Sequence, residues 1–445
     1  MKYIIMLVFI AGLLPGVGGN INLGFFYLSP LRLALLLLPV TYVGEHLLHI
    51  RNGKYVLKCE NRRFILFMVV WFVYSMATVF WCRDLSSWSH GEYFIGLGIW
   101  SMLFFDMAGL KKEDFLDILK AIQLAVIAHN ILGWYELLTH NYLFAPAERL
   151  VSMRASRQYY PITTMLNQND LILVLIWGAC ISAYFVLTSK KQKYKIINLM
   201  LFFSNIALGI ATDSRAGILG MIIAILILGG FILSKNQKIC FVGGMIALVS
   251  LSAILLPQIY MELWNKFQGI ELLNFENPNV NSDAVRLNLI RNGLVFLKET
   301  FGFGVGTSNA EYWMANETVY NVRGFTNVHN WWAEILTNFG IIIFVLYIIF
   351  YIFLFYSIWK RYRQEKDKNV KVFCMILLCF MGAFLAASVS SSSNWGKEWL
   401  WILWAFIIAF QGSSDISIER ESRNEKIERD KKVDLSSQLY FTNVQ

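Results

Sequence analysis

Four cationic residues stand out as candidates for chemistry on a phosphate-bearing substrate. They are Arg215, Arg286, Arg291 and His329. A guanidinium group binds phosphate oxygens through two parallel hydrogen bonds and keeps its charge at every working pH. An imidazole group accepts or donates a proton near neutral pH. Together these residue types suit a diphosphate-linked substrate and a hydroxyl that has to be activated.

Each of the four also has a simpler explanation. Arg215, in a short polar run, can reach out to water or pair with Asp213. Arg286 and Arg291 are five positions apart, so they do not share quite the same helical face, and either can be a solvated helix charge. A histidine beside tryptophans, as at His329, is usually an interfacial polar group. The topology favours chemistry, because it places all four on one side of a membrane.

The amino-acid composition indicates a membrane protein. The chain has 445 residues, 57% hydrophobic and 16% charged, with a mean hydropathy of +0.51. These values exclude a soluble globular protein. Apolar runs long enough to cross a hydrocarbon core of about 30 Å as helices indicate a polytopic helical membrane protein. The same runs exclude a transmembrane β-barrel, whose strands are about ten residues long and alternate with period two.

We therefore expect an all-α integral membrane protein with about twelve transmembrane helices. The predicted spans are residues 3–17, 31–50, 64–82, 93–110, 115–138, 171–188, 196–211, 216–233, 239–256, 332–359, 372–389 and 399–410. The first is interpreted as an uncleaved span, because no clear cleavage site for a signal peptide follows it.

Lysine and arginine clusters follow every second span. They lie at residues 51–63, 111–112, 190–195, 235–238 and 360–371. Short cytoplasmic loops carry such an excess of positive charge. Both termini are thus predicted to be cytoplasmic. The net charge of +9 mainly reflects the orientation of the chain in the membrane and does not indicate nucleic-acid binding.

Two outer connections, 141–170 and 257–331, are longer than simple loops. We divide the chain into N-terminal membrane helices (1–256), a large extracytoplasmic loop (257–331), C-terminal membrane helices (332–411) and a charged tail (412–445). The loop contains an amphipathic stretch at 283–300, and the tail is expected to be disordered cytoplasm. The chain shows no internal repeat, which disfavours inverted-repeat transporter folds.

Other patterns predict no cofactor or metal. The run GFGVG at 302–306 looks like half of a dinucleotide fingerprint, but it follows a helix-like stretch, so a flexible or close-packed turn is expected. The six cysteines are scattered without a CxxC pair and predict neither a disulfide framework nor a zinc site. No acidic DxD or HExxH pattern lies on the outer side, although isolated acids such as Asp170 and Glu334 could contribute.

Four runs of this sequence resemble motifs of the O-antigen ligase and O-antigen polymerase superfamily. SRAG at 214–217 is similar to its Ser-Arg-Gly/Ala turn, and NQND at 167–170 to its Asn-x-Asn motif. Residues 286–306 resemble its arginine-led helix and Gly-x-Gly turn, and His329-Asn330 its His-Asn motif. The resemblance covers roughly residues 167–350. Gln168 stands where proline is common and Ala216 where glycine is frequent, which leaves the subfamily open.

The resemblance implies a membrane-embedded inverting glycosyltransferase that moves undecaprenyl-diphosphate-linked glycans at the outer face of the cytoplasmic membrane. It implies that Arg215 and Arg286 bind the diphosphate of the donor and that His329 activates or orients the acceptor hydroxyl. Arg291 is a further candidate for the diphosphate. The residues expected to support the site are Asn169, Asp170, Asn330 and Glu334.

Two activities share this architecture. A polymerase joins repeat units on the lipid, whereas a ligase passes the finished chain to lipid A core or another acceptor. We expect a polymerase, because polymerases are the more numerous group. The expected partners are the lipid-linked donor, a glycan or lipid-linked acceptor and the bilayer, and not nucleic acid. A flippase for lipid-linked oligosaccharides is the competing class, and a receptor or scaffold that uses the charged tail is the third.

Overall fold

The computed structural model describes residues 1–22, 24, 27–50, 61–157, 159–237, 282–390 and 396–413. Several predictions fall outside this part of the chain. They concern the ninth span (239–256), the start of the large loop (257–281), the tail from residue 414, the cations at 51–58, Lys238, Cys59 and Cys240. The other four cysteines are free thiols, and Cys180, Cys374 and Cys379 are buried.

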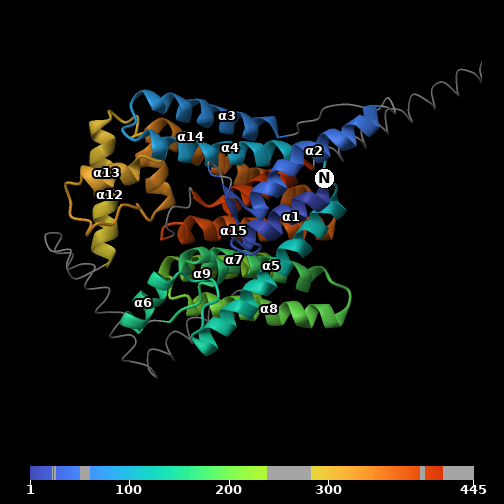
Figure 1. Ribbon diagram of the computed structural model, residues 1–445. Helices are drawn as coiled ribbons and strands as arrows, with labels where there is room; N and C mark the ends of the chain where they lie inside the picture. Colours follow the sequence, from blue (N-terminus) through green and yellow to red (C-terminus); the bar gives the residue numbers. More distant parts are fainter. Residues whose placement is uncertain are drawn as a thin grey trace, which may run out of the picture.

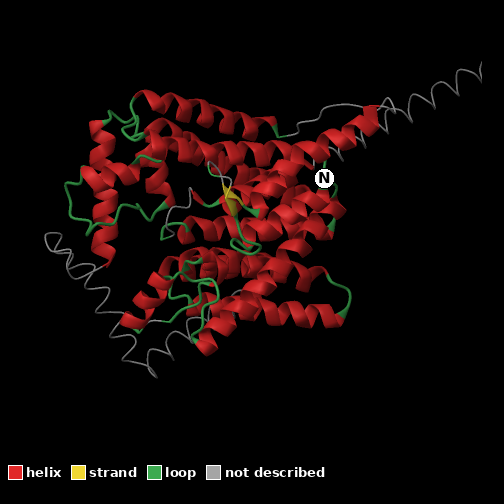
Figure 2. Ribbon diagram, in the orientation of Figure 1, coloured by secondary structure: helices red, strands yellow, loops and turns green. Residues whose placement is uncertain are grey.

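The described chain is almost entirely helical (Figures 1 and 2). Its elements are α1 (Lys2–Leu13), β1 (Ile21–Asn22), β2 (Tyr27–Leu28), α2 (Pro30–Ile50), α3 (Arg62–Ala77), η1 (Thr78–Phe80), α4 (Leu85–Met107), α5 (Lys112–Thr139), α6 (Ala147–Ser156), η2 (Thr163–Met165), α7 (Gln168–Thr188), α8 (Gln192–Ala211), α9 (Arg215–Ile232), α12 (Ser282–Glu299), α13 (Ala310–Asn316), α14 (Trp331–Gln364) and α15 (Lys368–Ala387), followed by an apolar helix, Glu398–Ser413. The two short strands pair as one antiparallel hairpin between α1 and α2.

Helices occupy all eleven of the predicted spans that the structure describes. Seven of them are long and apolar enough to cross a membrane: α3 with η1, α5, α7, α8, α9, α14 and α15. The helix α1 has 12 residues, and at 1.5 Å per residue it extends only about 18 Å. An all-helical membrane protein is therefore confirmed in kind, and the number of twelve spans stays a prediction.

The centre of the bundle is formed by helices that are apolar on every side. The residues of α7 from Leu171 to Ile181 are almost completely buried, and so are most of α15 and the helix Glu398–Ser413. A helix without a polar face has to be surrounded by other helices or lipid. Against α15, α9 packs closely at Gly220, where a Cβ atom would lie 2.8 Å from that of Ala387. By contrast, fewer than a quarter of the residues in the most apolar stretches of α8 and α9 are buried.

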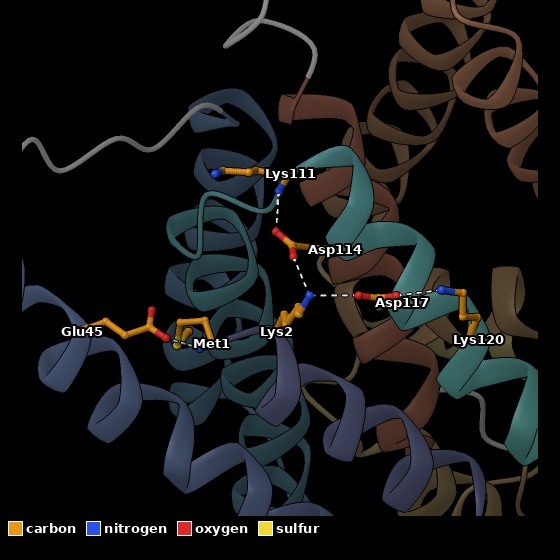
Figure 3. A network of polar contacts seen from close by, with 7 residues as sticks. All are labelled: Met1, Lys2, Glu45, Lys111, Asp114, Asp117 and Lys120. Atoms are coloured by element: carbon orange, nitrogen blue, oxygen red, sulfur yellow. Dashed lines mark hydrogen bonds and ion pairs between the residues drawn. The ribbon is translucent and has the colours of Figure 1, made fainter.

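One end of the bundle is held together by charged residues from the predicted cytoplasmic side (Figure 3). The Lys2 ammonium group lies 2.9 Å from the Asp117 carboxylate and 3.2 Å from that of Asp114, which joins α1 to α5. Lys112 pairs with Asp367 at the start of α15. The ends predicted to share one side of the membrane therefore do lie together, and the compartment that they face stays a prediction.

Candidate functional site

The opposite end of the bundle carries the large loop. The amphipathic stretch predicted at 283–300 is the helix α12, which lies across the ends of the bundle helices in Figure 1. Its Leu289 and Phe296 are fully buried and pack with Trp313 of α13 in a small apolar cluster. The described part of the loop, residues 282–330, thus has a core of its own and covers this end of the bundle. We call this part of the loop the roof.

The roof rests on a break in α14. At Gly340 the backbone of α14 leaves the helical conformation, with φ of 74° and ψ of −174°. The GFGVG turn fills the break, because the amide groups of Val305 and Gly306 donate to the carbonyl oxygens of Thr337 and Asn338 at 2.9 and 3.0 Å. Of the two forms expected for this turn, flexible or close-packed, the structure shows the close-packed one. It divides α14 into a short segment under the roof and a long membrane segment.

A second attachment joins the roof to the turn between η1 and α4. The buried Asn309 side chain accepts hydrogen bonds from the amide groups of Arg83 (3.1 Å) and Asp84 (2.8 Å) and donates to the Asp84 carbonyl oxygen. Nearby, Arg83 forms an ion pair with Glu317 at 2.5 Å. These contacts tie the loop to α4 as well as to α14.

Three of the four sequence motifs place helix N-termini at this end of the bundle. Asn167 caps α7 by accepting from the Asn169 amide at 2.8 Å, and Ser214 caps α9 by accepting from the Gly217 amide at 3.4 Å. Asn330 caps α14 and accepts from the amide groups of residues 332 and 333. The N-terminus of a helix carries a partial positive charge and is favourable for anions.

The segment after α15 links the three N-termini. The Trp331 amide donates to the Ser388 carbonyl oxygen at 3.1 Å. The Ser390 hydroxyl lies 3.4 Å from the Asn169 side-chain oxygen and 3.5 Å from the Ser214 hydroxyl. Asn169 and Ser214 come from motifs 45 positions apart. Their convergence with the start of α14 shows that the motifs meet at one place in the fold.

His329 lies at the edge of this place, one residue before the cap of α14. Its backbone φ is 51°, which is uncommon for a residue other than glycine. The Asn327 side chain holds this turn, since it accepts from the His329 amide at 2.9 Å and donates to Glu311 at 2.8 Å. Burial lowers the pKa of His329, and the charge of Arg286 lowers it further, whereas Glu311 acts in the opposite direction. Arg286 and Glu311 thus both act on His329.

The other candidate residues are distributed around this centre. Arg215 is the exposed first residue of α9. The guanidinium carbon of Arg291 lies 5.5 Å from the centre of the Tyr320 ring, within the loop. The Asp170 carboxylate is buried and lies 2.7 Å from the Lys397 ammonium group. Glu334 is 7% exposed.

Three residues of this region were not predicted from the sequence: Ser390, Lys397 and Glu311. A signal existed for Lys397, because the topology places it on the outer side, where lysine is rare near short connections. Ser390 and Glu311 carry no sequence signal, since a serine or a glutamate in a polar connection is ordinary. Their positions follow only from the contacts.

Two cavities lie in this region. The larger one, of about 470 Å³, is bordered by Asp170 and Lys397 among others. The smaller one, of about 180 Å³, lies under the roof between Glu311, Val328 and Glu334. Both are lined by Phe94 and Gly396. The two cavities are therefore neighbours.

The sequence is similar to those of known proteins. Residues 199–348 match the family model described as O-antigen ligase. The resemblance to this superfamily is thereby confirmed. The chain is also similar to a curated protein of Bacillus subtilis (strain 168) named teichuronic acid biosynthesis protein TuaE, with 29% identity over 398 residues, which cover 87% of this chain and 80% of the relative. Both findings point to a polysaccharide-biosynthesis enzyme of the ligase or polymerase type.

Proposed function

We propose that this protein is a polysaccharide polymerase, an inverting glycosyltransferase that moves a glycan from a polyprenyl diphosphate to a sugar hydroxyl at the outer face of the cytoplasmic membrane. The convergence of three capped helix N-termini beside the loop that carries Arg286 and His329 is the observation that supports it most. Arg215 starts one of these helices, α9. Cationic side chains and helix N-termini at one membrane surface suit a diphosphate.

In this mechanism Arg215 and Arg286 bind the diphosphate, and Arg291 is a further candidate. The acceptor oxygen forms a bond to the anomeric carbon from the face opposite the diphosphate, while the bond from that carbon to the phosphate oxygen breaks. The arginines stabilise the charge that develops on the leaving diphosphate. His329 takes the proton of the hydroxyl, and its lowered pKa, caused first by burial, keeps the imidazole neutral and able to accept it.

In this proposal the supporting residues position the site and line its cavities. Asn330 caps α14, and Asn169 contacts the Ser390 hydroxyl. Asp170 holds Lys397 beside the larger cavity. Glu334 lines the smaller cavity with Glu311.

A ligase that transfers the finished glycan to another acceptor is the second candidate. The description of the matching family, O-antigen ligase, favours it. The two activities share the donor site and differ in the acceptor. The product distinguishes them, because a polymerase extends its product repeatedly whereas a ligase modifies each acceptor once.

The test is reconstitution of the full chain in vesicles with a synthetic undecaprenyl-diphosphate oligosaccharide, followed by gel analysis. A ladder supports the polymerase, a single shift of an added acceptor supports the ligase, and no covalent change contradicts both. Arg215→Ala, Arg286→Ala and His329→Ala should each strongly reduce the amount of product at normal protein levels. Arg323→Ala is the matched control, because Arg323 is an exposed arginine of the same loop. Full activity in all three variants contradicts the proposed site.

We also propose that the reaction requires no metal ion. Arginine side chains and helix N-termini supply the positive charge that a divalent cation supplies in other glycosyl transfers to or from diphosphates. Activity should persist in excess chelator. Loss of activity that a divalent cation restores would contradict this part of the mechanism.

A further inference from the structure

An apolar groove runs along the membrane side of the larger cavity. It lies between α2 and α4, has a volume of about 380 Å³, and is lined by leucines 35, 36 and 97 together with Tyr93, Gly96 and Trp100. The indole of Trp100 donates to the Leu35 carbonyl oxygen at 3.0 Å and joins the two helices. Leu36 is 53% exposed. Such a surface is suited to one extended hydrocarbon chain from the bilayer.

Arg32 lies at the junction of this groove and the larger cavity, since it lines both. Its guanidinium group donates to Glu398 at 2.9 Å and lies over the Tyr93 ring at 4.8 Å. The Tyr93 hydroxyl donates to the same carboxylate at 2.7 Å. An arginine that is held in place where an apolar groove meets a polar cavity is suited to the phosphate of a lipid.

The cavity beyond Arg32 has a polar wall. It contains two ion pairs, Arg32 with Glu398 and Lys397 with Asp170, whose distances are 2.9 and 2.7 Å. These four side chains give the wall many hydrogen-bond donors and acceptors, which suits sugar hydroxyls. The order of groove, arginine and polar cavity is the order of lipid chain, phosphate and saccharide in a lipid-linked glycan.

The cavity also leads towards His329. Phe94 and Gly396 line both the larger cavity and the smaller one under the roof. The smaller cavity is bordered by Val328 and by Glu311, whose charge acts on His329. A saccharide that enters from the groove would therefore extend towards the proposed base. In contrast, α9, which begins with Arg215, packs against α15 and α7.

We infer that the groove between α2 and α4, Arg32 and the larger cavity form the binding site of the acceptor, a saccharide linked through phosphate to a single polyprenyl chain. This inference rests on the proposed function, in which Arg215 and Arg286 hold the donor. Each substrate then has its own site in the membrane, and the two saccharides meet under the roof.

The proposal is tested with substitutions that fill the groove but leave Arg215, Arg286 and His329 unchanged. A Cβ atom at Gly96 would meet no atom within 4 Å, so Gly96→Leu fills the groove without disturbing the fold. Gly44→Leu on α2 is the matched control, because its Cβ also meets nothing within 4 Å and Gly44 does not line the groove. Leu36→Trp narrows the groove from the other helix, with Leu33→Trp as its control, since Leu33 is 48% exposed on α2 outside the groove.

The probe is a photoactivatable undecaprenyl-diphosphate N-acetylglucosamine in vesicles of phosphatidylglycerol and phosphatidylethanolamine, with mass spectrometry of the labelled peptides. We expect labelling of α4 around Gly96 that falls about tenfold in Gly96→Leu and Leu36→Trp and is unchanged in both controls. A photoactivatable phosphatidylglycerol should label this segment weakly, and excess unlabelled undecaprenyl-diphosphate N-acetylglucosamine should not displace it.

The outcomes separate the two proposals. Equal labelling by phosphatidylglycerol, or labelling that the unlabelled compound does not displace, overturns the acceptor site and identifies a groove for bulk lipid. Normal transfer activity in Gly96→Leu and Leu36→Trp also overturns it, while the proposed function stands. Specific labelling of the groove without any saccharide transfer by the wild-type chain supports the binding site and contradicts the glycosyltransferase.

Discussion

Gly304 of the loop and Gly340 of α14 touch through their backbones. A Cβ atom on Gly304 would lie 2.5 Å from the Gly340 amide nitrogen, and a Cβ atom on Gly340 would overlap the Gly302 carbonyl oxygen. Both glycines have positive φ, of 80° and 74°. The contact is therefore possible only without side chains, and it positions the roof over the start of α14.

Gly304→Ala and Gly340→Ala should detach the roof. Overlap with a backbone and a strained conformation each cost about 1–3 kcal/mol, so we expect a lower melting temperature and loss of transfer activity. Gly324→Ala is the control, because Gly324 has a φ of 74° in the same loop but a Cβ atom there meets nothing within 4 Å. Similar effects of all three substitutions would show that strain alone, and not the contact, matters.

The pH dependence should report the neighbours of His329. If the neutral imidazole accepts the proton, activity rises with pH as His329 loses its proton, with a midpoint below the usual pKa of histidine, because burial lowers this pKa. Removal of the positive charge in Arg286→Gln should raise the pKa and move the midpoint to higher pH. Glu311→Gln should lower the pKa and move it to lower pH. Profiles of kcat/KM measure both shifts.

Arg286→Lys is the control for this experiment. It keeps the positive charge, so the midpoint should stay in place even if the rate falls. A midpoint that is the same in Arg286→Gln and Glu311→Gln as in the wild type would show that a group other than His329 is titrated.

The contribution of Arg215 to kcat/KM should depend on the forked shape of its guanidinium group as well as on its charge. Arg215→Lys keeps the charge but cannot form two parallel hydrogen bonds with a phosphate, and Arg215→Gln loses both. Hydrogen bonds to charged groups contribute about 1.5–3 kcal/mol, so kcat/KM should fall about tenfold in Arg215→Lys and about 100-fold in Arg215→Gln. Wild-type kinetics of Arg215→Lys would indicate that only charge is used.

Asn309 and Glu317 attach the same part of the roof with very different strength. Asn309→Ala leaves the partly buried amide groups of Arg83 and Asp84 without this acceptor, which should destabilise the protein by about 1–3 kcal/mol. Glu317→Ala removes only a half-exposed ion pair, worth about 0–1 kcal/mol. Thermal unfolding in detergent should rank the two variants in this order, and the reverse order would contradict the proposed attachment.

Asn330 should act as a helix cap and not as a catalytic group. Serine also caps helices well, so Asn330→Ser should keep transfer activity within about twofold, whereas Asn330→Leu should destabilise the protein by about 1 kcal/mol. Activity and melting temperature of the two purified variants measure this. Complete loss of activity in a stable Asn330→Ser protein would show that the amide contacts substrate.

The amino-acid sequence by itself determined the class of the protein, most of the helix positions and four motifs. Hydropathy and the alternation of basic clusters are local properties, since a span has to be apolar whether lipid or other helices surround it. For this reason the predicted spans at 171–188 and 372–389 agree closely with α7 and α15. The run at 302–306 could likewise be predicted as a turn, and the structure decided that this turn is close-packed.

Only the tertiary structure decided which residues surround those motifs. Ser390 joins Asn169 and Ser214, Lys397 pairs with Asp170, and Glu311 acts on His329. These partners are between 18 and 227 positions apart in the chain. Sequence patterns predict a helix from its periodicity but do not show which other helix end packs beside it. The packing of α7, α9, α14 and α15 makes that choice, because the N-termini of the first three helices meet at the segment that follows α15.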